Sequence, residues 1–187
     1  LEAGVQRACG PDAMLDDPLR VLRLARAVGG RAWRIDGETV RLARVAAGRL
    51  STVAGERIGA ELRGTLGAAR PLAGLAALEH TGGLEAVLPE VRALDGVEQS
   101  PYHHLDVGGH TREVIGYSVA LESRLADFVD DADAAAVTAG LSREVAGGWT
   151  LREATRFGAL LHDIAKPRTQ VLDERRVEVR AAARRVD

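Results

Sequence analysis

The fold class is decided by the stretch Asp16-Asp17-Pro18-Leu19-Arg20-Val21-Leu22-Arg23-Leu24-Ala25-Arg26-Ala27-Val28. Its leucines and valines recur at spacings of three and four, which places them on one face of a helix, while the arginines fall on the other face. Asp17 is the expected N-cap with Pro18 at the first helical position, and Gly29-Gly30 is the expected end. The stretch therefore predicts an amphipathic helix that carries a stripe of arginines.

Helical periodicity also dominates the chain outside this stretch. We expect further helices over 36–50, 51–67, 71–82, 110–129, 133–145 and 150–163. The last of these begins with Thr150-Leu151-Arg152-Glu153, which has the pattern of a capping box. Strand-like alternation is confined to 176–180, so the sequence predicts an all-α protein. Glycine and proline gather in 83–109, and we expect this junction to separate a first unit, 1–82, from a second, 110–187.

Length and composition exclude several classes of protein. The chain has 187 residues, and its single cysteine, Cys9, can form neither an internal disulfide nor a cysteine-based zinc site. The apolar runs are shorter than the roughly 20 residues that a bilayer requires. No phosphate-binding P-loop, dinucleotide fingerprint or nucleophile elbow is present. We expect a protein of the cytoplasm with no membrane partner.

The net charge of −2 conceals two unlike halves. All cations except Lys166 are arginines, and Arg20 to Arg70 holds 11 arginines against four acidic residues. Such a concentration favours a polyanionic partner, because each neutralised phosphate releases condensed counterions. A general compositional bias toward arginine on solvated surfaces is the alternative.

A second group of residues has the chemistry of a metal site. His162-Asp163 is followed by Lys166, and His110 lies shortly after the stretch Tyr102-His103-His104-Leu105-Asp106. Imidazole nitrogen and carboxylate oxygen together suit a divalent ion such as Mg, Mn, Fe, Co or Zn. The alternative is a helix-terminal aspartate beside a partly buried histidine.

These residues resemble the HD-domain pattern, in which a first histidine, a later His-Asp doublet and a final aspartate hold one or two metals on a helical scaffold. The resemblance rests on Asp106-Val107-Gly108-Gly109-His110-Thr111 and on 159–169, which includes His162-Asp163-Ile164-Ala165-Lys166-Pro167. It implies that His110, His162 and Asp163 are ligands for Mg, Mn, Ni or Fe, with Lys166 as the candidate catalytic group. The closing aspartate has no convincing counterpart in the 24 residues that follow the doublet.

The first half resembles the bacterial tRNA nucleotidyltransferases and poly(A) polymerases, the CCA-adding superfamily. The segment 16–26 is similar to its base-recognition motif, Glu56-Arg57-Ile58 with Glu61-Leu62 to the next motif, and Leu1-Glu2-Ala3-Gly4-Val5 with Arg7 to the end of the preceding one. Leu88-Pro89-Glu90 matches the junction to an HD domain. The resemblance runs from residue 1 to about Thr169 and implies a helical neck and body followed by a partial HD domain.

This resemblance implies a way to choose a nucleotide without a template. Asp17 would accept from, and Arg20 would donate to, the hydrogen-bonding edge of ATP or CTP, with Arg23 and Arg57 also at the nucleotide. The 3′ end of a tRNA or another RNA would lie along the arginine-bearing helices, on the candidate contacts Arg26, Arg41, Arg44 and Arg63. The alternative is that Asp17 caps its helix and pairs with arginines on a solvated surface.

The carboxylates that hold two magnesium ions for nucleotidyl transfer are missing from the sequence. The superfamily supplies them as Asp-x-Asp after Gly-Gly, and we expect them in a head domain before Leu1. Asp131-Ala132-Asp133 has the spacing but is expected in an acidic loop. We therefore expect part of an RNA nucleotidyltransferase, for CCA or poly(A) addition, with an appended HD domain. The alternatives are an HD phosphohydrolase with an RNA- or nucleotide-binding first half, and a binding module with both centres inactive.

Overall fold

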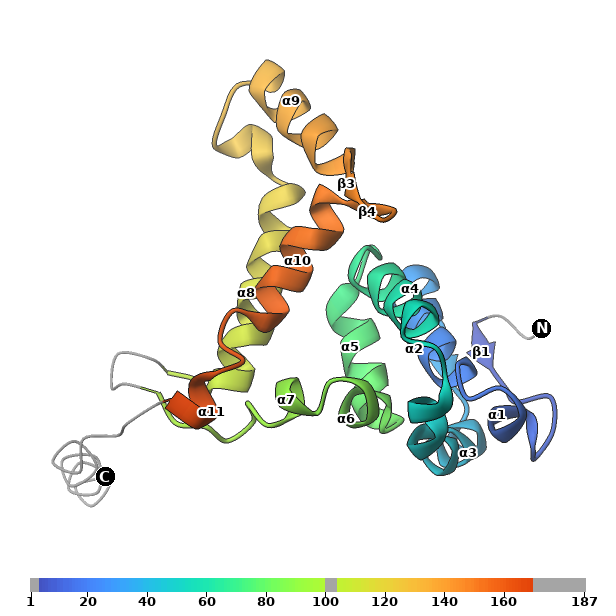
Figure 1. Cartoon of the computed structure of the whole chain (residues 1–187). Helices are drawn as coiled ribbons and strands as arrows, with labels where there is room; N and C mark the ends of the chain where they lie inside the picture. The colour runs from blue at the N-terminus through green and yellow to red at the C-terminus, as the bar shows by residue number, and fades with distance from the viewer. Residues whose placement is uncertain (1–3, 100–103, 170–187) are drawn as a thin grey trace, which may run out of the picture.

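The protein is an assembly of helices with two small pairs of strands, which confirms the prediction of an all-α fold (Figure 1). A computed structural model describes residues 4–99 and 104–169. The α-helices in these ranges are α1 Ala13–Asp16, α2 Arg20–Arg31, α3 Gly37–Ala47, α4 Gly55–Leu66, α5 Pro71–His80, α6 Gly83–Val87, α7 Pro89–Arg92, α8 Val107–Glu122, α9 Asp131–Ser142, α10 Leu151–Leu161 and α11 Lys166–Thr169. Two 3-10 helices are η1 Gly48–Thr52 and η2 Leu125–Asp127. Strand β1 Val5–Gln6 pairs in parallel with β2 Arg34–Ile35, and β3 Glu144–Ala146 pairs antiparallel with β4 Trp149–Thr150.

The core of the first half forms where α2 packs on α5 and α4. The apolar face predicted for α2 is buried, with Val21, Leu22 and Ala25 fully covered. Small residues allow the backbones to approach closely, because a Cβ added to Gly74 of α5 would lie 2.6 Å from Thr65 Cγ2 and 3.3 Å from the Ala25 carbonyl oxygen. The periodicity therefore identified the packing face of α2 correctly.

The ends of α2 differ from the prediction. Its N-cap is Leu19 and no side chain caps it, so Asp17 is not the capping residue. The helix continues through Gly29-Gly30 to Arg31, and its C-cap Ala32 has a left-handed φ of 59°. Tertiary packing explains the continuation, since the Gly29 carbonyl accepts from Arg70 N and a Cβ at Gly29 would approach the segment before α5.

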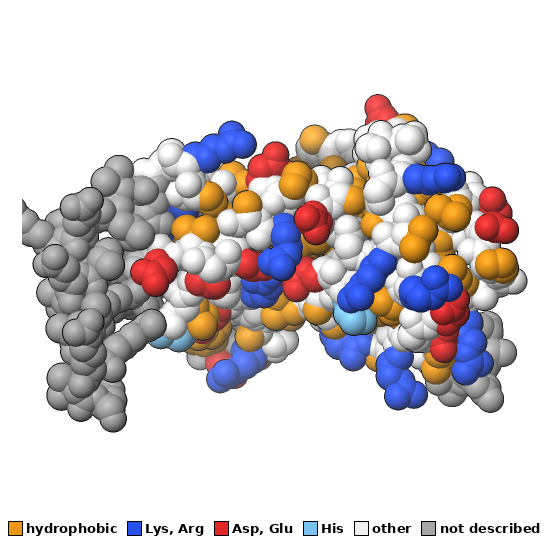
Figure 2. All heavy atoms as spheres, turned by 90° about the horizontal axis from the view of Figure 1, so that it is seen from below, with side chains coloured by type: hydrophobic (Ala, Val, Ile, Leu, Met, Phe, Trp, Pro, Cys, Tyr) orange, Lys and Arg blue, Asp and Glu red, His pale blue; other side chains and the backbone are white. Residues whose placement is uncertain are grey.

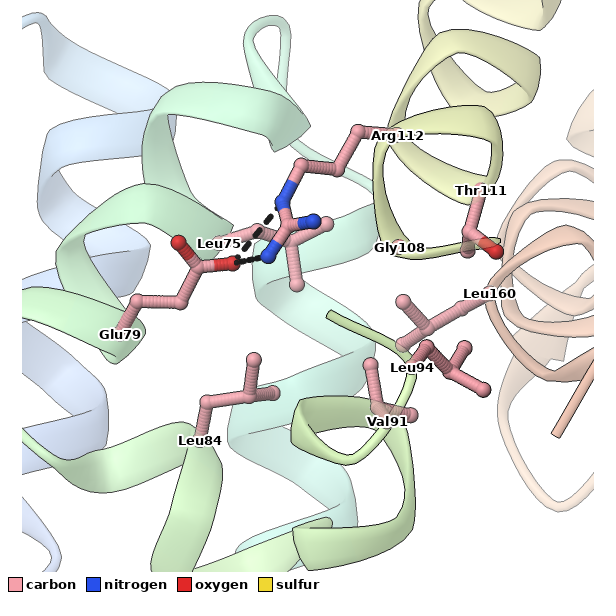
Figure 3. Close-up of a pocket in the computed structure, with 9 residues that line it drawn as sticks. All are labelled: Leu75, Glu79, Leu84, Val91, Leu94, Gly108, Thr111, Arg112 and Leu160. Atoms are coloured by element: carbon pink, nitrogen blue, oxygen red, sulfur yellow. Dashed lines mark hydrogen bonds and ion pairs between the residues drawn. The ribbon is translucent and has the colours of Figure 1, made fainter. Parts of the chain in front are cut away.

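The junction between the halves is packed and partly helical. Leu84 of α6, Val91 of α7 and Leu94 are buried, and Figure 3 shows them facing Leu75 of α5 and Leu160 of α10. The space left among these side chains is about 10 Å³, which is about the room that a single water molecule needs. This junction is therefore a hydrophobic contact between the halves and leaves no room for a ligand.

An arginine network reinforces the junction. Arg112 of α8 donates to Glu79 of α5 and to Asp95, and the hydrogen bond to Asp95 is the main reason that the Arg112 pKa is raised. Gly108 leaves the space that this network occupies, because a Cβ there would overlap Asp95 Oδ1.

The second half is built around α8 and α10, which lie side by side, with α9 at their far end (Figure 1). The capping box at Thr150 is confirmed. Asp106 caps α8, which therefore begins before His110 and ends at Glu122, short of the expected 129. Asp131 and Asp133 lie in the first turn of α9, so the expectation of an acidic loop there is wrong. The strand expected over 176–180 lies outside the described residues.

A buried arginine ties the second half to the first. Arg156 of α10 donates through Nη1 to the carbonyl oxygens of Leu66 (2.7 Å) and Ala68 (3.0 Å), at the end of α4. Its Nε and Nη2 donate to the two carboxylate oxygens of Glu122 on α8. The carbonyls at a helix end lack partners within the helix, so Arg156 satisfies them while it fixes α10 against α4.

Candidate functional site

The four residues predicted at the nucleotide come together at the start of α2. Asp17 lies between α1 and α2, and its Oδ2 is 3.0 Å from Arg23 Nη1 and 3.8 Å from Arg20 Nε. Arg57 of α4 brings its Nη2 to 3.8 Å from Asp17 Oδ1. A carboxylate is thus surrounded by three guanidinium groups that remain about half exposed, an arrangement that offers an acceptor and several donors to one ligand.

Glu61 of α4 also belongs to this cluster. It lies in one of the sequence motifs but was not predicted to be a nucleotide-binding residue. Its side chain is only 8% exposed, and its oxygens lie 3.3 Å from Arg23 Nε and 3.2 Å from Arg26 Nη1. Arg23 is therefore held between Glu61 on one side and Asp17 on the other. A glutamate on the same helix as Arg57, one turn further on, was the signal that could have revealed it.

A cavity of about 490 Å³ opens beside the cluster, between α2 and the segment that leads into α1. Its lining includes the aliphatic and sulfur side chains of that segment and of α2, together with three arginines and a tryptophan: Val5, Gln6, Arg7, Ala8, Cys9, Ala13, Met14, Arg20, Arg23, Leu24, Ala27 and Trp33. Its volume falls within the usual range for small-molecule sites.

Trp33 is the second residue that sequence reasoning missed. It follows α2 directly, and the guanidinium carbon of Arg31 lies 4.9 Å from the centroid of its ring, in cation–π geometry. The short β1–β2 ladder brings this residue against the N-terminal segment, where a Cβ added to Gly4 would lie 3.6 Å from Trp33 Cδ1. An aromatic residue directly after the arginine-bearing helix was the available signal, because aromatic planes stack on nucleobases.

The four arginines predicted to contact RNA all have partners within the protein. Arg26 pairs with Glu61, Arg41 with Glu38, and Arg44 donates to the His80 carbonyl oxygen. Arg63 donates to the carbonyl oxygen of Gly147. On the face shown in Figure 2, basic side chains are dispersed among acidic ones and form no single continuous patch.

The predicted metal ligands also come together, at the opposite end of the molecule. His110 lies in the first turn of α8, while His162 and Asp163 directly follow α10, and one ligand atom from each lies within 4.8 Å of the others. His162 Nε2 is 3.4 Å from His110 Nε2 and 3.3 Å from Asp163 Oδ2. His110 Nε2 is 4.0 Å from the same oxygen.

Two observations show that this triad fits a divalent ion. His162 Nδ1 lies 2.7 Å from the Ala159 carbonyl oxygen, which can only accept, so Nδ1 carries the proton and Nε2 presents its lone pair to the other ligands. Asp163 Oδ2 is buried and accepts no hydrogen bond of ordinary geometry from the described residues. The lone pairs of His162 Nε2 and Asp163 Oδ2 therefore converge beside His110 Nε2, and this set of ligand atoms suits a borderline metal ion.

The loop before α8 is fixed beside the triad. Asp106 accepts hydrogen bonds from Gly109 N and Gly96 N, which hold the pKa of its carboxyl below the usual range. Gln99 is buried, and its amide nitrogen donates to the carbonyl oxygens of Leu105 and Asp106. These contacts position the first turn of α8 and thereby His110.

Comparison with known proteins gives one family model and a consistent set of relatives. The model, described as the probable RNA and SrmB-binding site of polymerase A, matches residues 33–94. A multifunctional CCA protein of Nitrosospira multiformis is 38% identical over 139 residues, which are 70% of this chain and 33% of that protein. An A-adding tRNA nucleotidyltransferase of Deinococcus radiodurans is 32% identical over 178 residues, which are 92% of this chain and 35% of that protein.

A solved structure supports the same helical arrangement. It is of a tRNA-processing enzyme, with a TM-score of 0.57 at 17% identity, and the match covers 84% of this chain and 37% of that one. At this identity the likeness shows the fold. The chain spans about a third of the length of the curated relatives it matches.

Proposed function

Since the chain belongs to the tRNA nucleotidyltransferase and poly(A) polymerase superfamily, we propose that it selects the nucleotide and binds the RNA in an enzyme that extends RNA 3′ ends. The observation that carries this proposal is the exposed cluster of Asp17, Arg20, Arg23 and Arg57 beside a cavity of about 490 Å³. In this proposal the cluster belongs to a first unit, residues 1–82. A junction, residues 83–109, connects this unit to a second unit, residues 110–187.

Selection would depend on the base edge. A carboxylate accepts hydrogen bonds and a guanidinium donates them, so Asp17 and Arg20 together complement an amino group beside a ring nitrogen, which both ATP and CTP present. Arg23, already held by Glu61, would keep its place when Asp17 turns to the base. Trp33 and the apolar wall of the cavity would exclude water from the bound nucleoside.

Magnesium chemistry belongs elsewhere in the proposed enzyme. The sequence contains no Asp-x-Asp after Gly-Gly. Two magnesium ions have to be held against the triphosphate and the 3′-hydroxyl. The carboxylates that hold them would therefore come from the part of the enzyme that corresponds to the other two thirds of the relatives. The residues described here bind and orient; they do not form the bond.

Nucleotide affinity measures the role of Asp17. We expect the wild-type protein to bind ATP and CTP more tightly than GTP and UTP in calorimetric titrations, and Asp17→Ala to remove this preference. Glu38→Ala is the matched control, because Glu38 is also a carboxylate that pairs with an arginine on a helix of the first half. Retention of the preference by Asp17→Ala would refute base selection by this residue.

RNA is the second proposed partner, and its binding has a distinct signature. We propose that the phosphates of a tRNA 3′ end, in the cytoplasm, replace the present partners of four arginines: Arg26, Arg41, Arg44 and Arg63. Each phosphate contact contributes about 0.7 to 0.9 to the slope of log affinity against log salt. Affinity for a tRNA that does not change between 50 and 200 mM salt would contradict this surface.

The convergence of His110, His162 and Asp163 supports a second candidate function, that of a metal-dependent phosphohydrolase. When bound, Mg, Mn, Ni or Fe would supply a Lewis acid for a phosphoryl oxygen. The chain's own contribution is to hold two imidazole nitrogens and Asp163 Oδ2 toward one point, with Lys166 beside them. Phosphodiester cleavage in Mn²⁺ should be lost in His162→Ala and retained in His80→Ala.

A further inference from the structure

Lys166 places a cation at the candidate metal centre. Its Nζ lies 2.7 Å from Asp163 Oδ2. The same oxygen faces His162 Nε2 at 3.3 Å and His110 Nε2 at 4.0 Å. The ammonium group and the two imidazoles thus approach a single carboxylate oxygen, the one that a divalent ion between the three ligands would share.

The contact between Lys166 and Asp163 is electrostatic in character. Asp163 Oδ2 is buried but receives no hydrogen bond of ordinary geometry from the described residues, although the ammonium nitrogen is at contact distance. A buried carboxylate requires a counter-charge, and Lys166 supplies it. No well-directed hydrogen bond engages the lone pairs of Oδ2. Another cation can therefore replace the ammonium group at this oxygen, and no hydrogen bond to Oδ2 is lost.

Gln99 gives the ammonium group a second, fixed partner. Its Oε1 accepts from Lys166 Nζ at 2.8 Å, while its amide nitrogen donates to two backbone carbonyls of the loop before α8. These bonds leave the glutamine little freedom to turn. Lys166 can therefore release Asp163 and stay hydrogen-bonded at the edge of the triad.

We propose that Lys166 is an internal counter-ion that competes with the divalent metal for Asp163 Oδ2, and that Gln99 retains the ammonium group when the metal binds. The inference rests on the metal centre proposed above. Competition of this kind is reciprocal: the stabilisation that Lys166 gives to the metal-free protein lowers the apparent affinity for metal by the same factor.

The test compares Lys166→Met with wild type in two measurements. In calorimetric titrations with Mn²⁺, we expect Lys166→Met to bind about tenfold more tightly, within the usual range of such couplings. In EDTA we expect its thermal midpoint to fall by about 2 to 4 °C, because Asp163 loses its counter-charge. Saturating Mn²⁺ should then raise the midpoint of the variant more than that of wild type.

Two further variants separate the contact from general charge. Arg168→Met removes a positive charge two residues away whose side chain is exposed, and we expect its Mn²⁺ affinity and its midpoint in EDTA to match wild type. Lys166→Gln should behave as Lys166→Met does, which guards against a packing defect of the methionine.

The outcomes distinguish the inference from the function beneath it. Equal Mn²⁺ affinity in wild type and both Lys166 variants overturns the competition but leaves the metal centre. Tighter binding without a lower midpoint in EDTA indicates mere charge repulsion and also overturns it. Absence of Mn²⁺ binding by every protein overturns both the inference and the metal centre.

Discussion

Arg156 forms a joint between the two halves through its bonds to Glu122 and to the Leu66 carbonyl oxygen. This joint and the cluster at Asp17 are both built from arginines and carboxylates, yet they differ in exposure. The Arg156 side chain is 5% exposed, and its Nε and both terminal nitrogens donate to Glu122 or to backbone carbonyls. Arg20 and Arg23 are each 44% exposed and share Asp17. A buried arginine whose three nitrogens are all engaged holds the fold, whereas exposed arginines around one carboxylate can exchange partners with a ligand. Burial, more than the count of arginines, separates the two roles.

The largest effect should come from breaking the joint. We expect Arg156→Met to lower the free energy of unfolding by about 3 to 5 kcal/mol, because it leaves two carbonyls without a partner and Glu122 with Arg152 alone. Urea denaturation followed by circular dichroism measures the loss.

Arg152→Met is the matched control for the joint, since Arg152 pairs with the same Glu122 but is more exposed. It should cost less than half as much. Equal losses in the two variants would show that burial does not distinguish these arginines.

A smaller effect should come from Asp106, the carboxylate that fixes the start of α8. Removal of an N-cap side chain costs about 0.5 to 2 kcal/mol, so we expect Asp106→Ala to fall within this range at pH 7. Asp106→Asn keeps an acceptor at the cap and should lose less. A larger loss in the asparagine variant would contradict the capping role.

The contribution of Asp106 should also depend on pH. Hydrogen bonds from Gly109 N and Gly96 N lower its pKa in the folded protein, while in the unfolded chain a pKa near 3.9 is expected. Its stabilisation is therefore complete above that value and is lost as the pH falls through the lower folded pKa. The difference in stability between wild type and Asp106→Ala should shrink below about pH 4.

Sequence periodicity predicted the helices and the buried face of α2 because burial of an apolar stripe is a local property of the chain. It failed at the helix ends. Gly29-Gly30 does not stop α2, because α5 and the segment before it pack against those glycines, and this contact is made by residues some 40 positions away. The predictions failed where a distant segment decides the local conformation.

The sites show the same division between local and distant information. The residues Asp17, Arg20 and Arg23 were predicted from one motif, and the structure brings them together, but Glu61 and Trp33 join them only through the packing of α4 and β2. Likewise, Arg156 had no sequence signal as a joint, because its partners Glu122 and Leu66 come from two other helices.

A still smaller effect on stability is expected at Asp17. We expect Asp17→Ala to change the free energy of unfolding by less than about 1 kcal/mol, since ion pairs with exposed arginines contribute little. Urea denaturation measures it alongside Arg156→Met. A loss as large as that of Arg156→Met would make the Asp17 cluster a structural joint like the one at Arg156.

The smallest effect on stability should come from Arg41, whose pair with Glu38 lies fully on the surface. The hydrogen bond from Arg41 lowers the pKa of Glu38, but both side chains are exposed, so we expect Arg41→Ala to leave the urea midpoint unchanged. If Arg41 contacts an RNA phosphate, the same variant lowers the salt slope of tRNA binding by about 1. An unchanged slope with an unchanged midpoint would assign Arg41 to neither fold nor RNA, and would leave compositional bias as the reason for an arginine at this position.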